Sequence, residues 1–280
     1  PVSAKAATGC CNKRMTRQPA YQPTSEPLLG DKEPAAWEEL RADSPRPLLL
    51  LCDHANNHIP TRLRHLGLEL DVFGRHVAYD IGCEKLTRLL SERFNASALL
   101  ANYSRLVIDL NRHPGDGSSI PEVSDNIEIP GNHNLTPEQI RQREEALFWP
   151  YHNRIEQILE RISRRGQQPI LCSIHSFTPV FRDYQRPWHI GVLWDRDQRL
   201  SSPLLESLRQ EAELCVGDNE PYHARNPVGY TMDVHGERNG YPHVLLEIRQ
   251  DLINHDEGIN RWADIIYQHL DKVLEQVDLS

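Results

Sequence analysis

The stretch that decides the fold is a short apolar run followed at once by polar side chains, LLLLCDHANN at residues 48–57. A continuous apolar run of this length is typical of a β-strand that is covered on both faces of its sheet. The chain then changes character within one residue, to Asp53, His54, Asn56 and Asn57. A strand that leads into an ordinary polar loop explains this pattern, and so does an active site at the carboxyl end of the strand.

Apolar runs and amphipathic stretches alternate outward from this first strand. We expect further strands at 97–101, 106–110, 169–174, 189–194 and 243–248, and helices near 34–41, 81–94, 137–166, 203–215 and 257–276. Thr136, Pro137 and Gln139 form a good helix start, and Pro150 predicts a kink or break in the helix that follows. The alternation predicts an α/β fold with a mainly parallel or mixed central sheet and helices on both of its faces.

Length and composition fit one sizeable globular domain. The chain has 280 residues, of which 39% are hydrophobic and 25% are charged, as is common for proteins with a well-buried core. Residues 1–35 are rich in Pro, Ser, Ala and Thr and lack apolar periodicity. We therefore expect a flexible N-terminal extension at 1–35 and a single α/β hydrolase-type catalytic domain at 36–280.

Charge and cysteine usage exclude several classes of protein. The formal net charge of -9 argues against a nucleic-acid surface, which needs clustered cations. No segment approaches the roughly 18 apolar residues of a membrane helix, and no signal sequence opens the chain. The six cysteines are scattered and form no CxxC pair, which indicates reduced thiols. We expect a cytoplasmic protein without nucleic-acid or membrane partners.

Polar side chains gather at the carboxyl ends of the predicted strands, which is where sheets of this class bind their ligands. His54 follows the first strand, and His175 and Glu247 interrupt two later apolar runs. Two imidazoles and one carboxylate are a common set of catalytic zinc ligands. Asp80 and Asn57 are both candidates for the third ligand, and we favour Asp80 because an amide oxygen binds zinc more weakly than a carboxylate does.

Each of these residues also has a purely structural explanation. His54 fits a capping or hydrogen-bonding loop residue as well as a ligand, and Asp80 is well placed to cap the helix near 81. Glu247 and Arg249 share one face of a strand and could form a structural ion pair. The remaining polar cluster, which comprises Arg105, Asp109 and Arg112, fits a structural salt-bridge set.

Taken together, these clusters resemble the N-formylglutamate amidohydrolase family, in its predicted and less characterised branch. The resemblance covers roughly residues 48–275 and depends on motifs rather than on composition. The matching segments are DHANNHIP at 53–60, YDIG at 79–82, SRLVIDLNR at 104–112, SIHSF at 173–177, His235, and LEIRQD at 246–251.

The resemblance implies a phosphorylase/hydrolase-like three-layer sandwich akin to the zinc carboxypeptidases, with one bound Zn²⁺. It implies that His54 and His175 are zinc ligands and that Glu247 is the base that activates water. The residues that would surround the substrate are Arg105, Asn111, Arg112, His235 and Arg249. Asn57 departs from the HxxE pattern of the carboxypeptidases, which leaves the third ligand open.

The sequence therefore predicts a zinc-dependent amidohydrolase that cleaves a small N-acyl amino acid, such as N-formylglutamate. The alternative is a metal-free binding or scaffold protein that keeps the fold without the activity, and Asn57 at a possible ligand position motivates it. A serine hydrolase is disfavoured because the sequence contains no GxSxG nucleophile motif.

Overall fold

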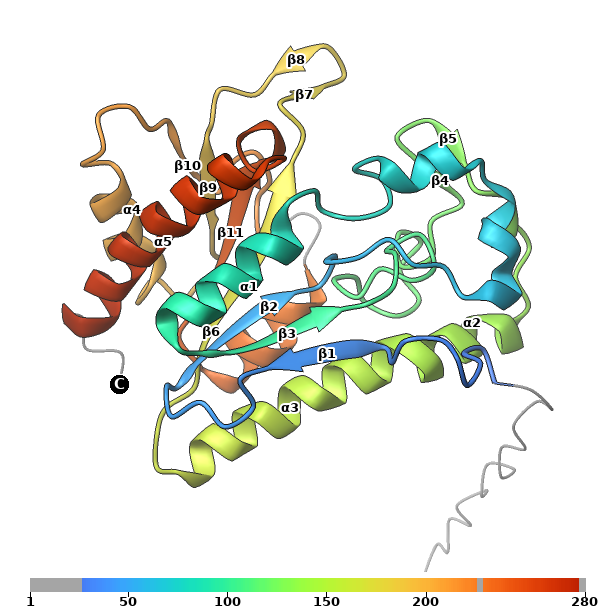
Figure 1. Ribbon diagram of the computed structural model, residues 1–280, viewed down its shortest axis with the longest axis horizontal. Helices are drawn as coiled ribbons and strands as arrows, with labels where there is room; N and C mark the ends of the chain where they lie inside the picture. Colours follow the sequence, from blue (N-terminus) through green and yellow to red (C-terminus); the bar gives the residue numbers. More distant parts are fainter. Residues whose placement is uncertain (1–26, 226–228, 277–280) are drawn as a thin grey trace, which may run out of the picture.

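A computed structural model describes residues 27–225 and 229–276, and its centre is a seven-stranded sheet (Figure 1). In the order in which they lie across the sheet, the strands are β1 (Trp37–Leu40), β3 (Ser97–Ala101), β2 (Leu48–Cys52), β6 (Ile170–Phe177), β11 (His243–Arg249), β9 (Ile190–Leu193) and β10 (Val216–Asp218). Two small hairpins lie outside this sheet, β4 (Val123–Ser124) with β5 (Ile127–Glu128), and β7 (Val180–Phe181) with β8 (Tyr184–Gln185).

The sheet is mixed, with a parallel centre. Strands β3, β2, β6 and β11 run parallel to one another, whereas β1 pairs antiparallel with β3 and β9 pairs antiparallel with β11. All five residues of β2 are buried, as the continuous apolar run predicts. The parallel centre brings the carboxyl ends of β2, β6 and β11 to one edge of the sheet.

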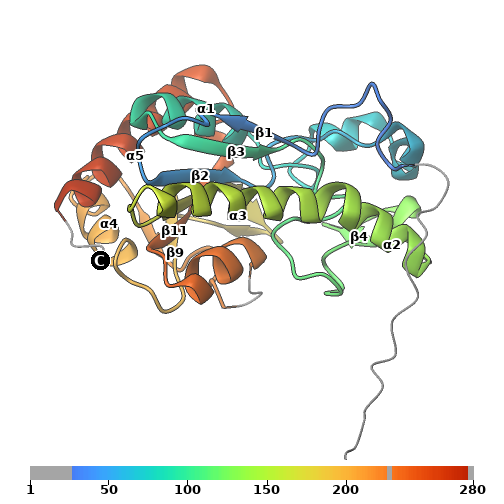
Figure 2. The same ribbon diagram turned by 90° about the horizontal axis from the view of Figure 1, so that it is seen from below.

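Helices cover both faces of the sheet and complete three layers (Figures 1 and 2). Helices α1 (Cys83–Phe94), α4 (Ser201–Leu208) and α5 (Asp256–Gln276) pack on one face, against alternate side chains such as Leu48 and Leu50. Helix α3 (Trp149–Arg164) packs on the other face, against Leu49 and Leu51. Because successive side chains of a strand point to opposite faces, one apolar run serves both cores.

The long helical segment before β6 has three parts. The α2 helix (Pro137–Arg143) starts with the predicted capping box, in which Thr136 Oγ1 accepts from the Gln139 backbone N–H and the Gln139 side chain accepts from the Thr136 N–H. One π-helical turn (Glu144–Phe148) leads into α3, and Pro150 falls in the first turn of α3, where proline is tolerated. Short helical turns occur at Thr61–Gly67, Leu70–Gly74, Pro130–Asn132, Met232–Gly236, Glu237–Asn239 and Gln250–Leu252.

Three local predictions are wrong. Residues 37–40 form the edge strand β1 instead of a helix, because they pair with β3. Residues 106–110 form turns instead of a strand, and they lie buried without a neighbouring strand to pair with. The α4 helix ends at Leu208 and not near 215, and the unpredicted strand β10 follows it. In each case long-range pairing or its absence outweighs local propensity.

Most of the predicted N-terminal extension, residues 1–26, lies outside the described residues, so its flexibility stays a prediction. Of the remainder, Leu28 is buried against the core on the α3 face. None of the helices in the described part of the chain combines the length and the apolar character that a membrane crossing needs.

Candidate active site

Three adjacent parallel strands supply the side chains at the carboxyl edge of the sheet. His54 lies two residues beyond the end of β2, His175 lies near the end of β6, and Glu247 lies near the end of β11. His175 and Glu247 are direct register partners across the β6–β11 pair. The topology therefore brings together residues that are 121 and 72 positions apart along the chain.

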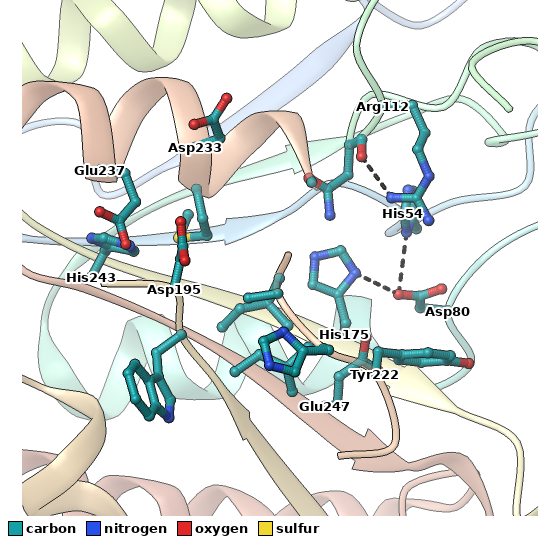
Figure 3. A pocket seen from close by; sticks show the side chains of 18 of the residues that line it. His54, Asp80, Arg112, His175, Asp195, Tyr222, Asp233, Glu237, His243 and Glu247 are labelled. Carbon is teal, nitrogen blue, oxygen red and sulfur yellow. Dashed lines mark hydrogen bonds and ion pairs between the residues drawn. The ribbon is translucent and has the colours of Figure 1, made fainter. Parts of the chain in front are cut away.

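Asp80 joins the two histidines (Figure 3). Its Oδ2 atom lies 2.8 Å from His175 Nδ1 and 3.3 Å from His54 Nδ1. One ligand atom from each of the three residues lies within 4.8 Å of the others, and all three side chains are buried. The capping alternative for Asp80 is wrong, because Gly82 is the N-cap of α1 and no side chain caps that helix.

A second carboxylate holds the far side of each imidazole ring. His54 Nε2 lies 2.7 Å from Asp109 Oδ1, and His175 Nε2 lies 3.3 Å from Asp53 Oδ2. A carboxylate on the other ring nitrogen fixes the orientation of a histidine and makes it a better metal ligand. Both Nδ1 atoms thereby remain directed at Asp80.

The two outer carboxylates are themselves anchored in different ways. Asp109 accepts from Arg105, with Nη2 at 2.7 Å from Oδ2, and from the backbone N–H of Asn111 at 2.9 Å. Asp53 accepts from the hydroxyl of Tyr151 in α3 at 2.8 Å. A chain of hydrogen bonds through Asp109 therefore holds His54. Asp53 reaches His175 as an ion pair, and the hydrogen-bond partner of His175 Nε2 is Ser173 Oγ at 3.0 Å.

These contacts keep the cluster charged despite its burial. Burial raises the pKa of Asp80, but the charges of His54 and His175 and their hydrogen bonds outweigh it and lower that pKa far below its usual range. Burial lowers the pKa of His175, but its interactions with the carboxylates of Asp53 and Asp80 outweigh burial and raise that pKa well above its usual range. For His54, burial and Arg105 lower the pKa, and Asp109 and Asp80 raise it to a net increase.

The charges of this cluster suit a divalent cation. Three carboxylates (Asp53, Asp80 and Asp109) and one guanidinium (Arg105) leave two negative charges around the two imidazoles. Two protons on the histidines balance these charges, and so does a single divalent cation between the Nδ1 atoms and Asp80. Two imidazole nitrogens and a carboxylate oxygen are also donor types that zinc and other divalent transition metals bind.

Glu247 faces the same site with a free carboxylate oxygen. Its Oε2 atom is buried and has no hydrogen-bond partner among the described residues. Burial raises its pKa to about 7, against the opposing positive charge of His175. The structural alternative for this residue is not found, because Arg249 pairs with Asp251 at 2.8 Å. A buried carboxylate poised near neutral pH is suited to proton transfer.

A cavity of about 210 Å³ opens in front of the two histidines, Asp80 and Glu247, whereas Asp53 and Asp109 lie behind its lining. Residues from β6, β9 and β11, from the 104–112 loop, from positions 222–224 and 229, and from the helical turns at 232–239 line it. The lining includes Arg105, Asn111 and Arg112 of the predicted substrate residues, together with His54, Asp80, His175 and Glu247.

The structure places three predicted site residues elsewhere. His235 is buried beside His152, with their Nε2 and Nδ1 atoms 3.0 Å apart, and it does not line the cavity. Arg249 is directed at Asp251 and at the Arg186 carbonyl, outside the cavity lining. The Asn57 amide donates to the Phe73 carbonyl at 2.6 Å, so Asp80 is the third member of the cluster.

Several residues of the site were not predicted from the sequence. Asp53 and Asp109 hold the histidines, and their only local signal is position: Asp53 directly precedes His54, and Asp109 lies within the polar motif 104–112. Further residues of the cavity lining that were not predicted come from loops, helical turns and the start of β11, and include Trp194, Asp195, Tyr222, Asp233, Glu237 and His243.

Comparisons with known proteins agree with this geometry. Residues 46–254 match the family model for N-formylglutamate amidohydrolase. A gene product of Agrobacterium tumefaciens has a similar crystal structure, with 35% identity, a TM-score of 0.86, and coverage of 89% of this chain and 98% of that one. An N-formylglutamate amidohydrolase from Ralstonia eutropha shares the fold at 16% identity, with a TM-score of 0.59 and coverage of 87% and 98%. A comparison with curated proteins gives no significant match.

The expected fold class, a zinc-carboxypeptidase-like α/β sandwich with a mixed central sheet, is confirmed. The family model covers well over half of the chain, and the motifs that it spans include the cluster at the carboxyl edge of the sheet. The chain therefore belongs to the N-formylglutamate amidohydrolase family and is a hydrolase that acts on amide bonds.

Proposed function

We propose that this protein is a zinc-dependent amidohydrolase that removes the acyl group from a small N-acyl amino acid. The observation that carries the proposal is the cluster of His54, Asp80 and His175, with carboxylates behind both histidines and the unpartnered Glu247 in front. N-formylglutamate, the substrate in the family's name, is the reference compound for testing it.

His54 and His175, through Nδ1, and Asp80, through a carboxylate oxygen, would hold the zinc ion. A bound zinc ion supplies Lewis acidity toward the acyl carbonyl and lowers the pKa of water to about 7. Asp53 and Asp109 keep both imidazoles oriented, so the ligand set is preorganised.

Glu247 would act as the general base. It accepts a proton from the attacking water as the water oxygen bonds to the acyl carbon. It then returns that proton to the amide nitrogen as the C–N bond breaks, which releases a carboxylate (formate, for a formyl group) and the free amino acid. The partly polar, buried setting that raises the Glu247 pKa also keeps bulk water away from this transfer.

Arg112 would bind the α-carboxylate of the substrate. Its guanidinium lines the cavity and donates to the Asn111 carbonyl at 2.8 Å, and it forms no ion pair with any described residue. Asn111 Oδ1 accepts from the Thr231 backbone N–H, which leaves the amide Nδ2 as a donor toward the cavity. Arg105 contributes positive charge while it holds Asp109.

The proposal is tested by hydrolysis of N-formyl and N-acetyl amino acids with and without a chelator, together with elemental analysis of the purified protein. We expect about one zinc per chain and a loss of turnover on chelation that added zinc restores. A metal-free protein that binds N-acyl amino acids without hydrolysing them would support the scaffold alternative instead. A cytoplasmic location is part of this proposal, because Cys52, Cys83 and Cys172 are free and buried.

A further inference from the structure

The catalytic cavity has two ends of different chemistry (Figure 3). At one end, the proposed zinc ligands lie beside Arg105 and Arg112. At the other, which we name the acidic end, lie Asp195, Asp233, Glu237 and His243. The acidic end is built from the loop after β9, from the helical turns at 232–239 and from the start of β11, and none of these segments provides a proposed zinc ligand.

The carboxylates of the acidic end line the cavity, whereas the arginines and His113 that pair with them do not; His243 pairs with Glu237 from within the lining. Asp195 pairs with Arg225 and Arg196, Asp233 pairs with Arg238 and His113, and Glu237 pairs with Arg196 and His243. The three arginine side chains are 58–69% exposed and do not line the cavity, while the carboxylates are 7–32% exposed. The charged groups that face the cavity at this end are therefore mainly carboxylates, while the guanidinium groups that pair with them face solvent, where water and salt weaken their field.

The same cavity contains an unsatisfied buried group, Glu247, whose side chain has a free oxygen. Glu247 is 8% exposed and lies in the cavity wall, and burial of a carboxylate oxygen without a partner is costly unless a ligand or an ion completes it. We therefore expect the cavity to hold a ligand. The proposed zinc ligands and Glu247 occupy one part of its wall, and the acidic end is the part that remains for the rest of the ligand.

The charge of the acidic end favours some substrate side chains over others. A substrate whose α-carboxylate binds Arg112 and whose amide lies at the histidines has the acidic end left for its side chain. A glutamate side chain would place a carboxylate against Asp195, Asp233 and Glu237, and like charges brought together in this way oppose binding. An ammonium or guanidinium group meets opposite charge there instead.

We propose that the preferred substrates are N-acyl amino acids with a cationic side chain, selected by Asp195 and Asp233 at the acidic end. This inference rests on the proposed amidohydrolase function and names its substrate class. Glu237 also contributes negative charge, but its Oε1 accepts from the backbone N–H groups of Arg196 and Asp197, so it shapes the loop as well.

The test compares four compounds on the zinc-loaded protein: Nα-formyl-lysine, Nα-formyl-arginine, N-formylglutamine and N-formylglutamate. We expect kcat/KM for the two cationic compounds to exceed that for N-formylglutamate by at least about tenfold. The value for the neutral compound, N-formylglutamine, should lie between that of the cationic compounds and that of N-formylglutamate. The double variant Asp195→Asn/Asp233→Asn should reduce this preference by about tenfold or more. Glu160→Gln, on the exposed face of α3, is the matched control and should leave the preference unchanged.

The outcomes separate the two proposals. Equal or faster hydrolysis of N-formylglutamate overturns the substrate class and leaves the amidohydrolase function intact. If none of the four compounds is hydrolysed, the proposed function fails, and calorimetric binding of the same compounds still decides the charge preference. Tighter binding of Nα-formyl-lysine than of N-formylglutamate supports it, and the reverse order overturns it. The wild-type comparison holds even if the double variant does not fold.

Discussion

The protein contains two pairs of buried histidines, and in each pair the two rings are in contact. The pairs differ in ring geometry, in the groups around them and in pKa. His54 and His175 meet edge to face, with ring centroids 5.0 Å apart and an interplanar angle of 71°. His152 and His235 stack, with centroids 5.2 Å apart and an angle of 17°. All four are less than 4% exposed, so exclusion from water alone does not explain what each pair does.

The difference is in the carboxylates. The pair of His54 and His175 touches Asp53, Asp80 and Asp109, which raise the pKa of both imidazoles against the effect of burial. The other pair has no carboxylate within ion-pair distance among the described residues. Burial and the neighbouring His235 lower the pKa of His152 to about 3, and burial lowers that of His235 to about 4.

The contacts of the second pair suit two neutral rings, although the buried Nδ1 of His235 has no hydrogen-bond partner among the described residues. His152 Nε2 donates to the Leu110 carbonyl at 2.9 Å, which leaves its Nδ1 to accept from His235 Nε2. The same residue type therefore forms a candidate cation site where buried carboxylates surround it and a neutral structural contact where they do not. The predictions below test this contrast.

The largest effect is expected from His175→Gln, because it removes a proposed zinc ligand. We expect zinc to be lost from the purified protein and turnover to fall below detection, as measured by elemental analysis and by hydrolysis assays. The matched substitution in the other pair, His235→Gln, should leave zinc stoichiometric. Loss of zinc in the His235 variant while its fold is retained would show that the two pairs are not as distinct as their contacts indicate.

Glu247→Gln tests the proton transfer separately from the metal. We expect kcat to fall by about 10²–10⁴-fold with zinc retained, because the glutamine amide cannot accept the proton. In the wild type, kcat/KM should decline as the pH falls through the Glu247 pKa, which is about 7 without a cation and lower with one. A glutamine variant that keeps wild-type turnover would remove Glu247 from the mechanism.

Asp53→Asn tests the carboxylate behind His175. We expect zinc affinity to weaken by about 10–100-fold, the usual cost of losing a carboxylate that orients a ligating histidine. Competition with a chromogenic chelator measures this without any need for turnover. Tyr151→Phe keeps Asp53 but removes its hydroxyl partner, and it should have a smaller effect in the same direction. An unchanged affinity in Asp53→Asn would contradict the role given to that residue.

The last prediction concerns the stability of the metal-free protein in acid. His152 and His235 stay neutral in the folded state down to pH values of about 3 and 4, whereas an unfolded chain protonates them near 6.5. The unfolded state therefore binds more protons as the pH falls below 6.5. Each histidine should therefore lower the free energy of unfolding by up to about 1.4 kcal/mol per pH unit. Glu247, whose raised pKa of about 7 makes the folded state bind its proton first, opposes this decline over the same range.

Urea unfolding between pH 7 and pH 4.5, with a chelator present, measures this slope. His235→Gln removes one of the two titrating rings and should make the decline shallower. A slope that is the same in the wild type and in this variant would mean that the buried pair does not remain neutral in the folded protein.

The sequence by itself determined the features that depend on short stretches of chain. The apolar run at 48–52 became a strand buried on both faces, and the Thr136 and Gln139 capping box formed as predicted. His54, His175 and Glu247 were identified because each one breaks or ends an apolar run, and the carboxyl ends of parallel strands meet at one edge of a sheet. The motifs also indicated the family, which the family model confirms.

Only the tertiary structure decided which polar residues meet. Asp80 was as good a helix cap as a ligand until β6 placed His175 beside it, 95 positions along the chain, and His235 matched a motif but lies in the neutral pair. The segment at 106–110 is apolar enough for a strand, yet it forms turns because no neighbouring strand pairs with it. The acidic end is assembled from the loop after β9, the helical turns at 232–239 and the start of β11. Hydrophobic periodicity and helix caps depend on residues that are close in sequence. Charge pairing inside a folded core depends on distances between residues that are far apart in sequence, and only the assembled sheet and its loops set these distances.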